Sequence, residues 1–454
     1  MRFSQPDPAQ GPLYPQALAV LEAALAAADP AQAVHRALHR EGDILFVDDR
    51  PYDLRQFRRV LVVGAGKATA PMAHAVEGLL GDRITAGTVT VKYGYTAPTR
   101  VITVREAGHP IPDEAGVAAT QAIANLLHDT TADDLVLCLI SGGGSALMPL
   151  PVPGVSLTDL QALTEALLRS GAPIQALNTV RKHLSQVAGG QLARLAYPAT
   201  VVALIVSDVV GSPLDVIASG PTVADESTFE QAWQVLERYG VLEHISAPIH
   251  QHLQRGLSGE IPDTPKPGDP ALARVHNVIV TDNAHAAAAA VDKATALGFN
   301  ALLLTTYLEG EAREIGRVLA ALAKEIAWRG HPLPPPACLI AGGETTVTVR
   351  GQGTGGRNQE VALSAALAIQ DLPGVVIASL ATDGTDGPTD AAGGLVDGLT
   401  IARGQGRGAD PLAALRDNDA YHFLERAGAL LITGPTNTNV NDLLAVFVGT
   451  PAQS

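Results

Sequence analysis

The sequence Leu61-Val-Val-Gly-Ala-Gly-Lys67 joins a short apolar run to a glycine-rich turn, and Leu137-Cys-Leu-Ile-Ser-Gly-Gly-Gly-Ser-Ala146 repeats that arrangement. Each apolar run is too short for anything but a buried strand, and each turn leads into a helix-like stretch. Glycines let backbone N–H groups and a helix N-terminus approach an anion closely. Two such junctions, one of them ending in Lys67, predict a protein that handles phosphate.

The composition indicates a compact α/β protein that acts on small molecules. Of 454 residues, 46% are hydrophobic, 17% are charged and 45 are glycine, which is not the composition of a disordered chain. The formal net charge of −15 argues against a nucleic-acid partner, but a site for an anionic substrate needs only a few local cations. Apolar runs are interrupted well before the roughly 18 residues that a membrane span needs, so we expect no membrane partner.

The two cysteines predict a reducing compartment. Cys138 and Cys338 each lie inside a predicted buried strand, where cysteine is most often a small hydrophobe rather than half of a disulfide or a metal ligand. The start of the sequence has no basic segment followed by an apolar one, so we expect no signal peptide and a cytoplasmic protein.

Apolar runs and helix-like stretches alternate along the chain, which is typical of α/β domains. A connector, Gly259–Pro270, carries four prolines and predicts a domain boundary. We therefore expect a doubly wound, Rossmann-like domain over residues 1–260 and a mixed α/β domain over 275–454. The predicted strands are 60–63, 87–91, 101–104, 135–140, 201–206, 278–280, 301–305, 338–341, 375–380 and 430–432. The predicted helices are two within 14–40 and one each at 71–80, 114–128, 157–169, 179–196, 284–297, 311–328, 358–370 and 411–427.

The first glycine turn matches no complete phosphate signature. Gly64 and Gly66 begin a dinucleotide fingerprint, but its third glycine is replaced by Thr69, and the P-loop spacing is absent. A plain tight turn is an equal alternative. Lys67, however, would lie at the carboxyl edge of a parallel strand, where α/β sheets bind ligands.

The second turn is the stronger candidate for binding phosphate. Three successive glycines exclude most packing roles, although a flexible turn stays an alternative. The residues expected to bind here are Ser141, Gly142, Gly143, Gly144 and Ser145.

Two further segments of the first half carry charge at predicted element ends. Asn178-Thr-Val-Arg-Lys-His183 is expected to open a helix, so Arg181 would oppose the helix dipole unless a bound anion compensates it. A solvated basic face is the alternative. Asp208 follows the strand 201–206 and would hold a metal, orient a hydroxyl or cap a helix.

The densest candidate region lies in the second half. Glu344 ends one predicted strand, and four glycines between 351 and 356 predict a loop that is mobile or very close to a ligand. Arg357 follows at a helix start, where it would clamp a phosphate or carboxylate unless the segment is only a surface loop.

Two acid- and amide-rich loops follow later strands. Asp383 and Asp386 lie in a glycine-rich loop that suits Mg²⁺, with a pure turn as the alternative. Asn439 lies in Gly434-Pro-Thr-Asn-Thr-Asn-Val-Asn-Asp442, which supplies amide donors and a carboxylate after the last predicted strand.

Taken together in this order, these motifs resemble those of the class II glycerate kinases, and the C-terminal part resembles the domain called MOFRL. The resemblance covers residues 15 to 445, approximately. It rests on the segments 62–68, 141–146, 178–183, 219–222, 342–344, 355–360, 381–387 and 434–439.

The resemblance implies a two-domain kinase with its active site in a cleft between the domains. The reaction would move a phosphoryl group from ATP to D-glycerate, giving 2-phosphoglycerate, with Mg²⁺ as cofactor and a monomer or homodimer as the working form. Lys67 and Arg357 would be the essential cations. Four acids are candidates for two further roles. Asp208 and Glu344 would orient the acceptor hydroxyl, and Asp383 and Asp386 would hold the metal. The residues themselves leave these assignments interchangeable.

Two other functions are weighed against this one. An NAD(P)H-dependent hydroxypyruvate reductase would need the missing third glycine and an acid closing the next strand, where Val91 is followed by Lys92. A non-catalytic binding protein for a small organic anion would not need the acid-rich loop Asp383–Asp390.

Overall fold

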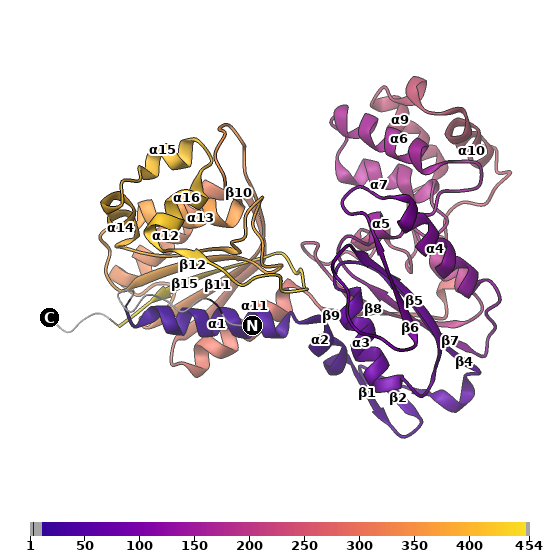
Figure 1. Ribbon diagram of the computed structural model, residues 1–454, viewed down its shortest axis with the longest axis horizontal. Coiled ribbons are helices and arrows are strands. Elements are labelled where there is room, and N and C mark those ends of the chain that lie inside the picture. Colours follow the sequence, from indigo (N-terminus) through magenta and orange to yellow (C-terminus); the bar gives the residue numbers. More distant parts are fainter. Residues whose placement is uncertain (1–2, 4–10, 451–454) are drawn as a thin grey trace. The chain divides into compact units, whose positions relative to one another are not determined.

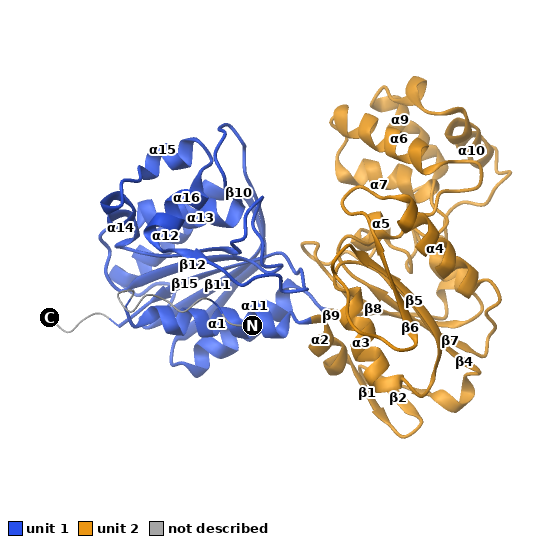
Figure 2. Cartoon of the chain, in the orientation of Figure 1, with its two compact units in different colours: residues 1–29, 281–454 blue, residues 30–280 orange. Residues whose placement is uncertain are grey.

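The computed structural model describes Phe3 and residues 11–450, and the chain passes twice between two units of structure (Figure 1; Figure 2). Unit 2 comprises residues 30–280, and unit 1 combines residues 1–29 with 281–454. Both units hold a six-stranded sheet with helices, so the expected α/β class is confirmed.

The boundaries of the units differ from the expected domains. Helix α1 (Leu13–Ala27) packs against α11 (Asn283–Ala296) in unit 1, and Thr281 Oγ1 donates to the carbonyl of Ala27 at 3.2 Å. The proline-rich segment is part of unit 2, because Asp263 accepts a hydrogen bond from His183 and Arg194 pairs with Asp269, both at 2.9 Å. Prolines here shape a packed segment rather than a linker.

The sheet of unit 2 has the order β6-β5-β4-β7-β8-β9, and its first five strands are mutually parallel. The chain moves outward from β4 to β6 and then crosses back to β7. Right-handed crossovers therefore put α3 and α4 on opposite faces, which is a doubly wound arrangement. The strands are β4 (Arg59–Ala65), β5 (Ile84–Lys92), β6 (Ile102–Ala107), β7 (Asp134–Ile140), β8 (Thr200–Val206) and β9 (Val275–Thr281).

Helices of unit 2 cover this sheet and form a second apolar core beside it. Residues of β4, β7 and β8 pack with α4 and α8 in one core, while α6, α7, α9 and α10 build the other. The helices are α2 (Pro30–Ala37), α3 (Thr69–Leu80), α4 (Glu114–Leu127), α5 (Gly144–Leu147), α6 (Leu157–Arg169), α7 (Ile174–His183), α8 (Gln191–Ala196), α9 (Phe229–Arg238) and α10 (Ala247–Leu257). Short 3-10 turns are η2 (Leu54–Gln56), η3 (Ile217–Ser219), η4 (Leu242–His244) and η5 (Pro270–Leu272).

A small antiparallel sheet that the sequence did not predict precedes β4. Its strands are β1 (Leu38–Glu41), β2 (Ile44–Val47) and β3 (Arg50–Asp53), joined by two-residue turns.

The sheet of unit 1 is mixed, with the order β10-β11-β15-β12-β13-β14. Only β10 and β11 are parallel neighbours, and β15 runs antiparallel to both β11 and β12. The strands are β10 (Asn300–Glu311), β11 (Ala337–Thr346), β12 (Val375–Ala381), β13 (Gly393–Asp397), β14 (Leu430–Leu431) and β15 (Asp442–Val448).

Unit 1 has three layers. Helices α1 and α11 lie side by side on one face of the sheet, and α12, α13 and α16 build the core on the other (Figure 1). The remaining helices are α12 (Ala312–Arg329), α13 (Arg357–Ala368), α14 (Thr400–Gly406), α15 (Pro411–Arg416) and α16 (Ala420–Ala427).

Two predicted helices are divided. The stretch 179–196 is broken by Gly189 and Gly190, both at positive φ, and the stretch 411–427 is broken at Asn418, at φ 55°. Over residues 11–450, no single helix is long and apolar enough to cross a bilayer. Helices α1 and α2, which are bent by 60° relative to each other, are long and apolar enough when taken together, by length and composition alone.

Candidate active site

The first cluster of candidate residues lies at one edge of the unit 2 sheet. Strands β4, β7 and β8 are parallel neighbours, so the loops at their carboxyl ends meet there. These loops begin with Gly66-Lys67, with Ser141 and with Ser207-Asp208. The structure thus brings Lys67, the 141–145 loop and Asp208 together, at the edge where parallel α/β sheets bind ligands.

Hydrogen bonds lock the first two loops together. The hydroxyl of Ser141 accepts from the backbone N–H of Ala68 at 3.0 Å, and the N–H of Lys67 donates to the carbonyl of Gly142 at 2.9 Å. A Cβ added at Gly64 or Gly66, both at positive φ, would overlap Leu139 or Ser141. These two glycines are therefore explained by close packing of neighbouring loops.

Three side chains surround the second loop. A Cβ at Gly142 would overlap the carboxylate of Asp208, and one at Gly143 would lie 2.8 Å from the ring of His109 and 3.6 Å from Cγ of Lys67. Within residues 11–450, the backbone N–H groups of Gly142 and Gly143 have no hydrogen-bond acceptor. Such free donors beside a lysine suit an anion.

His109 also lies beside the candidate site, and the sequence did not predict it. Burial, followed by the charges of Lys67 and Lys92, lowers the pKa of His109 to about 4, so the ring is neutral at pH 7. Its position just beyond the expected strand 101–104 was the available signal, because that strand ends at the same sheet edge. Lys67 is half-buried and forms no ion pair in the described part of the chain.

A strained turn closes this side of the site. Ala218 and Ser219 have φ angles of 49° and 61°, in the left-handed region that non-glycine residues rarely adopt. The hydroxyl of Ser219 lies 2.8 Å from that of Ser145. Strain of this kind clusters at functional sites, which supports a role for the segment Ser219–Thr222.

The expectation for Arg181 was wrong in one respect. Residues 178–183 end α7 instead of opening a helix, so their cations complement the dipole. Lys182 pairs with buried Asp225 at 3.2 Å, and His183 pairs with Asp263. Arg181 contacts Thr164 at 3.4 Å and forms no ion pair with any described residue, while burial lowers its pKa. Among these three basic residues, Arg181 alone has no described acidic partner and is left for an anionic ligand.

A cavity of about 640 Å³ opens beside α7. Its charged lining is Lys182 with Asp215, Asp225 and Glu226, so the carboxylates outnumber the cations. This balance does not suit an anionic substrate, and we place the candidate site at the sheet edge instead.

The second cluster lies at one edge of the unit 1 sheet. Strands β11 and β12 run in the same direction, because both are antiparallel to β15. Glu344 near the end of β11, the loop after β12, and Asp442 at the start of β15 therefore share an edge with the start of α13.

Arg357 is held by two carboxylates at this edge. Its Nε and Nη2 donate to the two carboxylate oxygens of Asp442 at 2.6 and 2.9 Å, and its Nη1 pairs with Glu344 at 3.0 Å. Burial alone would lower the pKa of Arg357, but Asp442 and Glu344 raise it above its ordinary value. A guanidinium has five N–H donors, so two stay available for a ligand.

The two expected metal ligands have different environments. Buried Asp386 accepts from the backbone N–H groups of Asn358 and Gln359 at 3.2 and 2.8 Å, which caps α13. Asp383 is half-buried and accepts from the N–H of Thr385 at 3.1 Å. No group of three or more His, Cys, Asp or Glu within residues 11–450 is placed to hold a metal ion.

Three of the four glycines before Arg357 are required by packing. A Cβ at Gly351 or Gly353 would overlap the backbone of Asp417, and one at Gly356 would overlap Asp386. Backbone N–H groups of this loop also donate to the side chains of residues 417–419. These bonds tether the loop, so the predicted mobile loop is wrong, whereas its contact with a ligand stays a prediction. Asn439 similarly braces its own loop, accepting from the N–H of Asn441 at 3.1 Å.

The fold and these two clusters define an α/β enzyme that acts on small anionic molecules. A family model described as a domain of unknown function, DUF4147, matches residues 16–254, and the MOFRL family model matches residues 337–442. The chain belongs to the glycerate kinase family that carries a MOFRL domain, as the sequence motifs predicted.

Similar proteins support this membership. A glycerate 2-kinase from Pyrococcus horikoshii is 45% identical over 94% of this chain and 95% of its own length. A D-glycerate 2-kinase from Thermotoga maritima is 49% identical over 85% of this chain and 90% of its own. The crystal structure of a Thermotoga maritima glycerate kinase superposes with a TM-score of 0.87 and 44% identity, covering 96% of this chain and 99% of that one. A relative from Agrobacterium vitis, 42% identical over 95% of this chain and 93% of its own, is provisionally named a hydroxypyruvate reductase.

Proposed function

We propose that this chain transfers the γ-phosphoryl group of ATP to the 2-hydroxyl of D-glycerate, giving 2-phosphoglycerate. A kinase of this family takes a nucleotide and a small acid as substrates. The observation that carries the proposal is Lys67, a half-buried cation without an ion pair in the described chain, beside the free N–H groups of Gly142 and Gly143. Phosphoryl transfer requires mainly positioning and neutralised charge, which these groups supply.

Unit 2 would bind and polarise the phosphoryl group. The ammonium of Lys67 would neutralise charge on its oxygens, and the two glycine N–H groups would donate to them. Asp208, which borders Gly142, would accept a hydrogen bond from the acceptor hydroxyl and take its proton. Neutral His109 would add a hydrogen bond without adding charge.

Unit 1 would recognise a carboxylate or phosphate through Arg357. Asp442 and Glu344 fix the plane of the guanidinium, and its two remaining N–H donors suit a planar carboxylate such as that of glycerate. Glu344 would therefore act by positioning Arg357. The placement of the active site between the two domains stays a prediction.

The acids of unit 1 are consistent with a Mg²⁺ ion that binds together with the nucleotide phosphates. Asp442 and Glu344 are engaged by Arg357, and Asp386 caps α13, so Asp383 is the carboxylate of this set with the fewest contacts to other side chains. Mg²⁺ is commonly bound by one or two carboxylates together with substrate phosphates. When bound, the ion would neutralise charge on the phosphates, and Asp383 would hold it.

The structure of the first glycine turn argues against a nicotinamide-dependent reductase. The space at Gly64 and Gly66 is filled by Leu139 and Ser141, whereas a dinucleotide fingerprint keeps such space for the pyrophosphate. We further propose a cytoplasmic enzyme, monomeric or homodimeric, without nucleic-acid or membrane partners.

One experiment separates the two reactions. The purified chain is incubated with ATP, Mg²⁺ and D-glycerate, and the product is identified by phosphorus NMR; a parallel sample receives hydroxypyruvate and NADH. We expect 2-phosphoglycerate in the first and no NADH oxidation in the second. Oxidation of NADH without a phosphorylated product would contradict the kinase proposal and favour the reductase.

A further inference from the structure

A cavity of about 720 Å³ lies in unit 2, apart from the candidate cluster at the carboxyl edge of the unit 2 sheet. It opens at the amino ends of β7 and β8, because Asp133 and Thr200 lie in its wall. Ser141 and Asp208 lie beyond the opposite ends of these seven-residue strands, about 20 Å away at the usual rise per residue. The cavity is therefore separate from the unit 2 part of the proposed active site.

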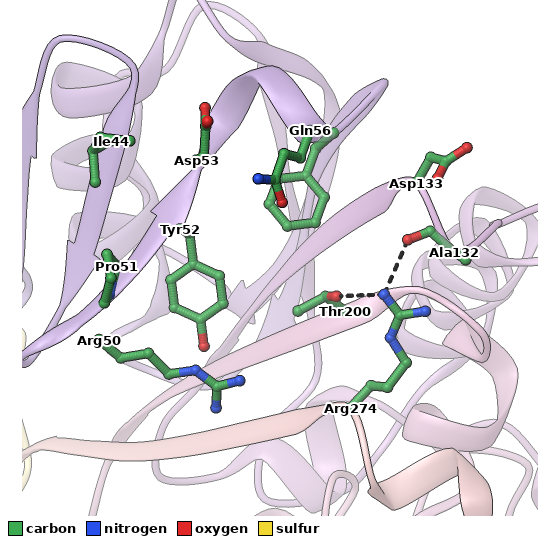
Figure 3. Close-up of a pocket in the computed structure, with 11 residues that line it drawn as sticks. Ile44, Arg50, Pro51, Tyr52, Asp53, Gln56, Ala132, Asp133, Thr200 and Arg274 are labelled. Carbon is green, nitrogen blue, oxygen red and sulfur yellow. Dashed lines mark hydrogen bonds between the residues drawn. The ribbon is translucent and has the colours of Figure 1, made fainter.

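The small sheet β1–β3 supplies one wall of this cavity. Ile44, Arg50, Pro51, Tyr52 and Asp53 come from its strands, while Arg274 comes from the segment just before β9 (Figure 3). Figure 3 shows Arg50 beside Tyr52 on one side of the cavity and Arg274 beside Thr200 on the other. The proposed reaction leaves this small sheet without a role.

The two arginines bring charge that is not compensated within the described chain. Neither forms an ion pair with any residue of 11–450. Arg274 uses Nη2 to bind the carbonyl of Ala132 and the hydroxyl of Thr200, both at 3.1 Å, so three of its five N–H donors are free. Arg50 lies over the ring of Tyr52, 5.3 Å from its centroid, and its donors have no acceptor in this part of the chain.

Of the two acids that line the cavity, one is already bound by a cation outside it. Both carboxylate oxygens of Asp53 are bound by Arg55, at 2.9 and 2.8 Å, which lowers the pKa of Asp53 to about 2. Asp133 is exposed, as Arg50 and Arg274 are, and forms no ion pair in the described chain, so it offsets one of the two positive charges. Tyr52 is buried and its hydroxyl lies 2.9 Å from Nδ1 of His276, whose pKa is lowered by burial and by Arg50, so the histidine stays neutral and adds no charge.

We propose that this cavity binds a small organic molecule with two anionic groups, one for each of Arg50 and Arg274. Its volume falls in the range of small-molecule sites, and guanidiniums favour carboxylate and phosphate ligands. The ligand is either a phosphorylated acid or a polycarboxylate, because both present two anionic groups. Binding at this edge of the sheet is independent of the proposed kinase reaction.

The test uses isothermal titration calorimetry on the full chain with 2-phosphoglycerate, citrate and inorganic phosphate as probes. Hydrogen exchange locates the binding, since protection over residues 44–57 separates this cavity from protection at 141–145. We expect one of the first two probes to protect 44–57 and to bind more tightly than inorganic phosphate. Whether 2-phosphoglycerate or citrate binds shows whether the ligand is a phosphorylated acid or a polycarboxylate.

The double variant Arg50→Gln with Arg274→Gln should weaken that binding by roughly tenfold to a hundredfold, the usual effect of losing hydrogen bonds to a charged group. The matched control is Arg169→Gln with Arg238→Gln, two surface arginines of unit 2, one of which also lies over a tyrosine ring. Kinase rates without added ligand should be unchanged in both. Binding that survives the cavity variant, no protection at 44–57 with any probe, or equal affinity for inorganic phosphate would overturn the proposal.

Discussion

The guanidinium of Arg357 and the carboxylate of Asp442 face each other through two parallel hydrogen bonds, of 2.6 and 2.9 Å. Asp442 is buried, with 1% of its side chain exposed, whereas Arg357 retains 32%. The carboxylate therefore fixes the arginine from the interior and leaves its outer edge accessible. Arginine at this position acts as a planar fork whose orientation is set by the protein before any ligand arrives.

Replacing Arg357 by lysine should not restore activity. A lysine keeps the charge but cannot bind both oxygens of Asp442 while presenting two donors in one plane. For Arg357→Lys we expect kcat/KM to fall by about 10²-fold or more, as when other donors that stabilise charge are lost. For Asp442→Asn we expect a smaller decrease in kcat/KM, because the guanidinium of Arg357 is still present. Steady-state kinetics of both variants checks this. A lysine variant with near-normal kcat/KM would leave only a simple charge role.

Replacing Lys67 by alanine should abolish most turnover while leaving the fold intact. The side chain is half-buried and forms no ion pair in the described chain, so its loss removes no structural contact of that kind. The expected decrease in kcat is on the order of 10²–10³. Lys324→Ala, which removes a half-buried lysine from α12, is the charge-matched control. Normal turnover in a folded Lys67 variant would remove this residue from the mechanism.

Asp383 and Asp386 should respond differently to substitution. Asp383→Asn should raise the Mg²⁺ concentration needed for half-maximal activity and leave the thermal midpoint unchanged. Asp386→Asn should lower the thermal midpoint, because one of the two α13 N–H groups loses its acceptor. Titration of Mg²⁺ after EDTA treatment, combined with thermal unfolding, measures both. An identical Mg²⁺ dependence for Asp383→Asn would mean that this acid only shapes a turn.

Much of the fold could be predicted because buried parallel strands are continuous apolar runs. The runs at 60–63, 135–140 and 201–206 all proved to be strands, with their polar residues at one edge. Strands β1–β3, β13 and β15 were not predicted. Four-residue strands have too short a pattern, and Gly393-Gly394 resembles a loop. The buried apolar run of β15 was overlooked although its pattern was present. The turns Gly42-Asp43 and Asp48-Asp49 between β1, β2 and β3 were the usable signal.

The candidate site was predictable in its residues more than in their contacts. Sequence motifs identified Lys67, the 141–145 loop and Arg357, but not that Asp442 binds Arg357, since the two are 85 residues apart. The same limit explains the glycine loop. Its glycines avoid the backbone of Asp417, a segment far along the chain, and nothing local to the loop reveals that neighbour.

This packing makes a direct prediction. Gly353→Ala should lower the free energy of unfolding by about 1–3 kcal/mol, the usual cost of overpacking, because the new Cβ would overlap Asp419 and Asp417. Gly406→Ala, where nothing lies within 4 Å of the added atom, is the control and should be neutral. Urea unfolding compares the two. Equal stability of both variants would show that residues 351–356 are free to move.

Asp386 should make stability decrease as the pH rises in metal-free buffer. Burial raises the pKa of this carboxyl to about 6, against the ordinary value of 3.8, although the two α13 N–H groups partly oppose the shift. Between these values the folded chain binds more protons at this site than the unfolded chain does, so the stabilisation is complete below pH 4 and is lost as the pH passes through 6. The shift corresponds to about 3 kcal/mol of stabilisation.

Asparagine cannot titrate, so Asp386→Asn should remove this pH-dependent part of the free energy of unfolding. Urea unfolding of both proteins with EDTA at pH 4, 5, 6 and 7 measures it. Parallel pH profiles for the two proteins would show that folding does not raise the pKa of Asp386.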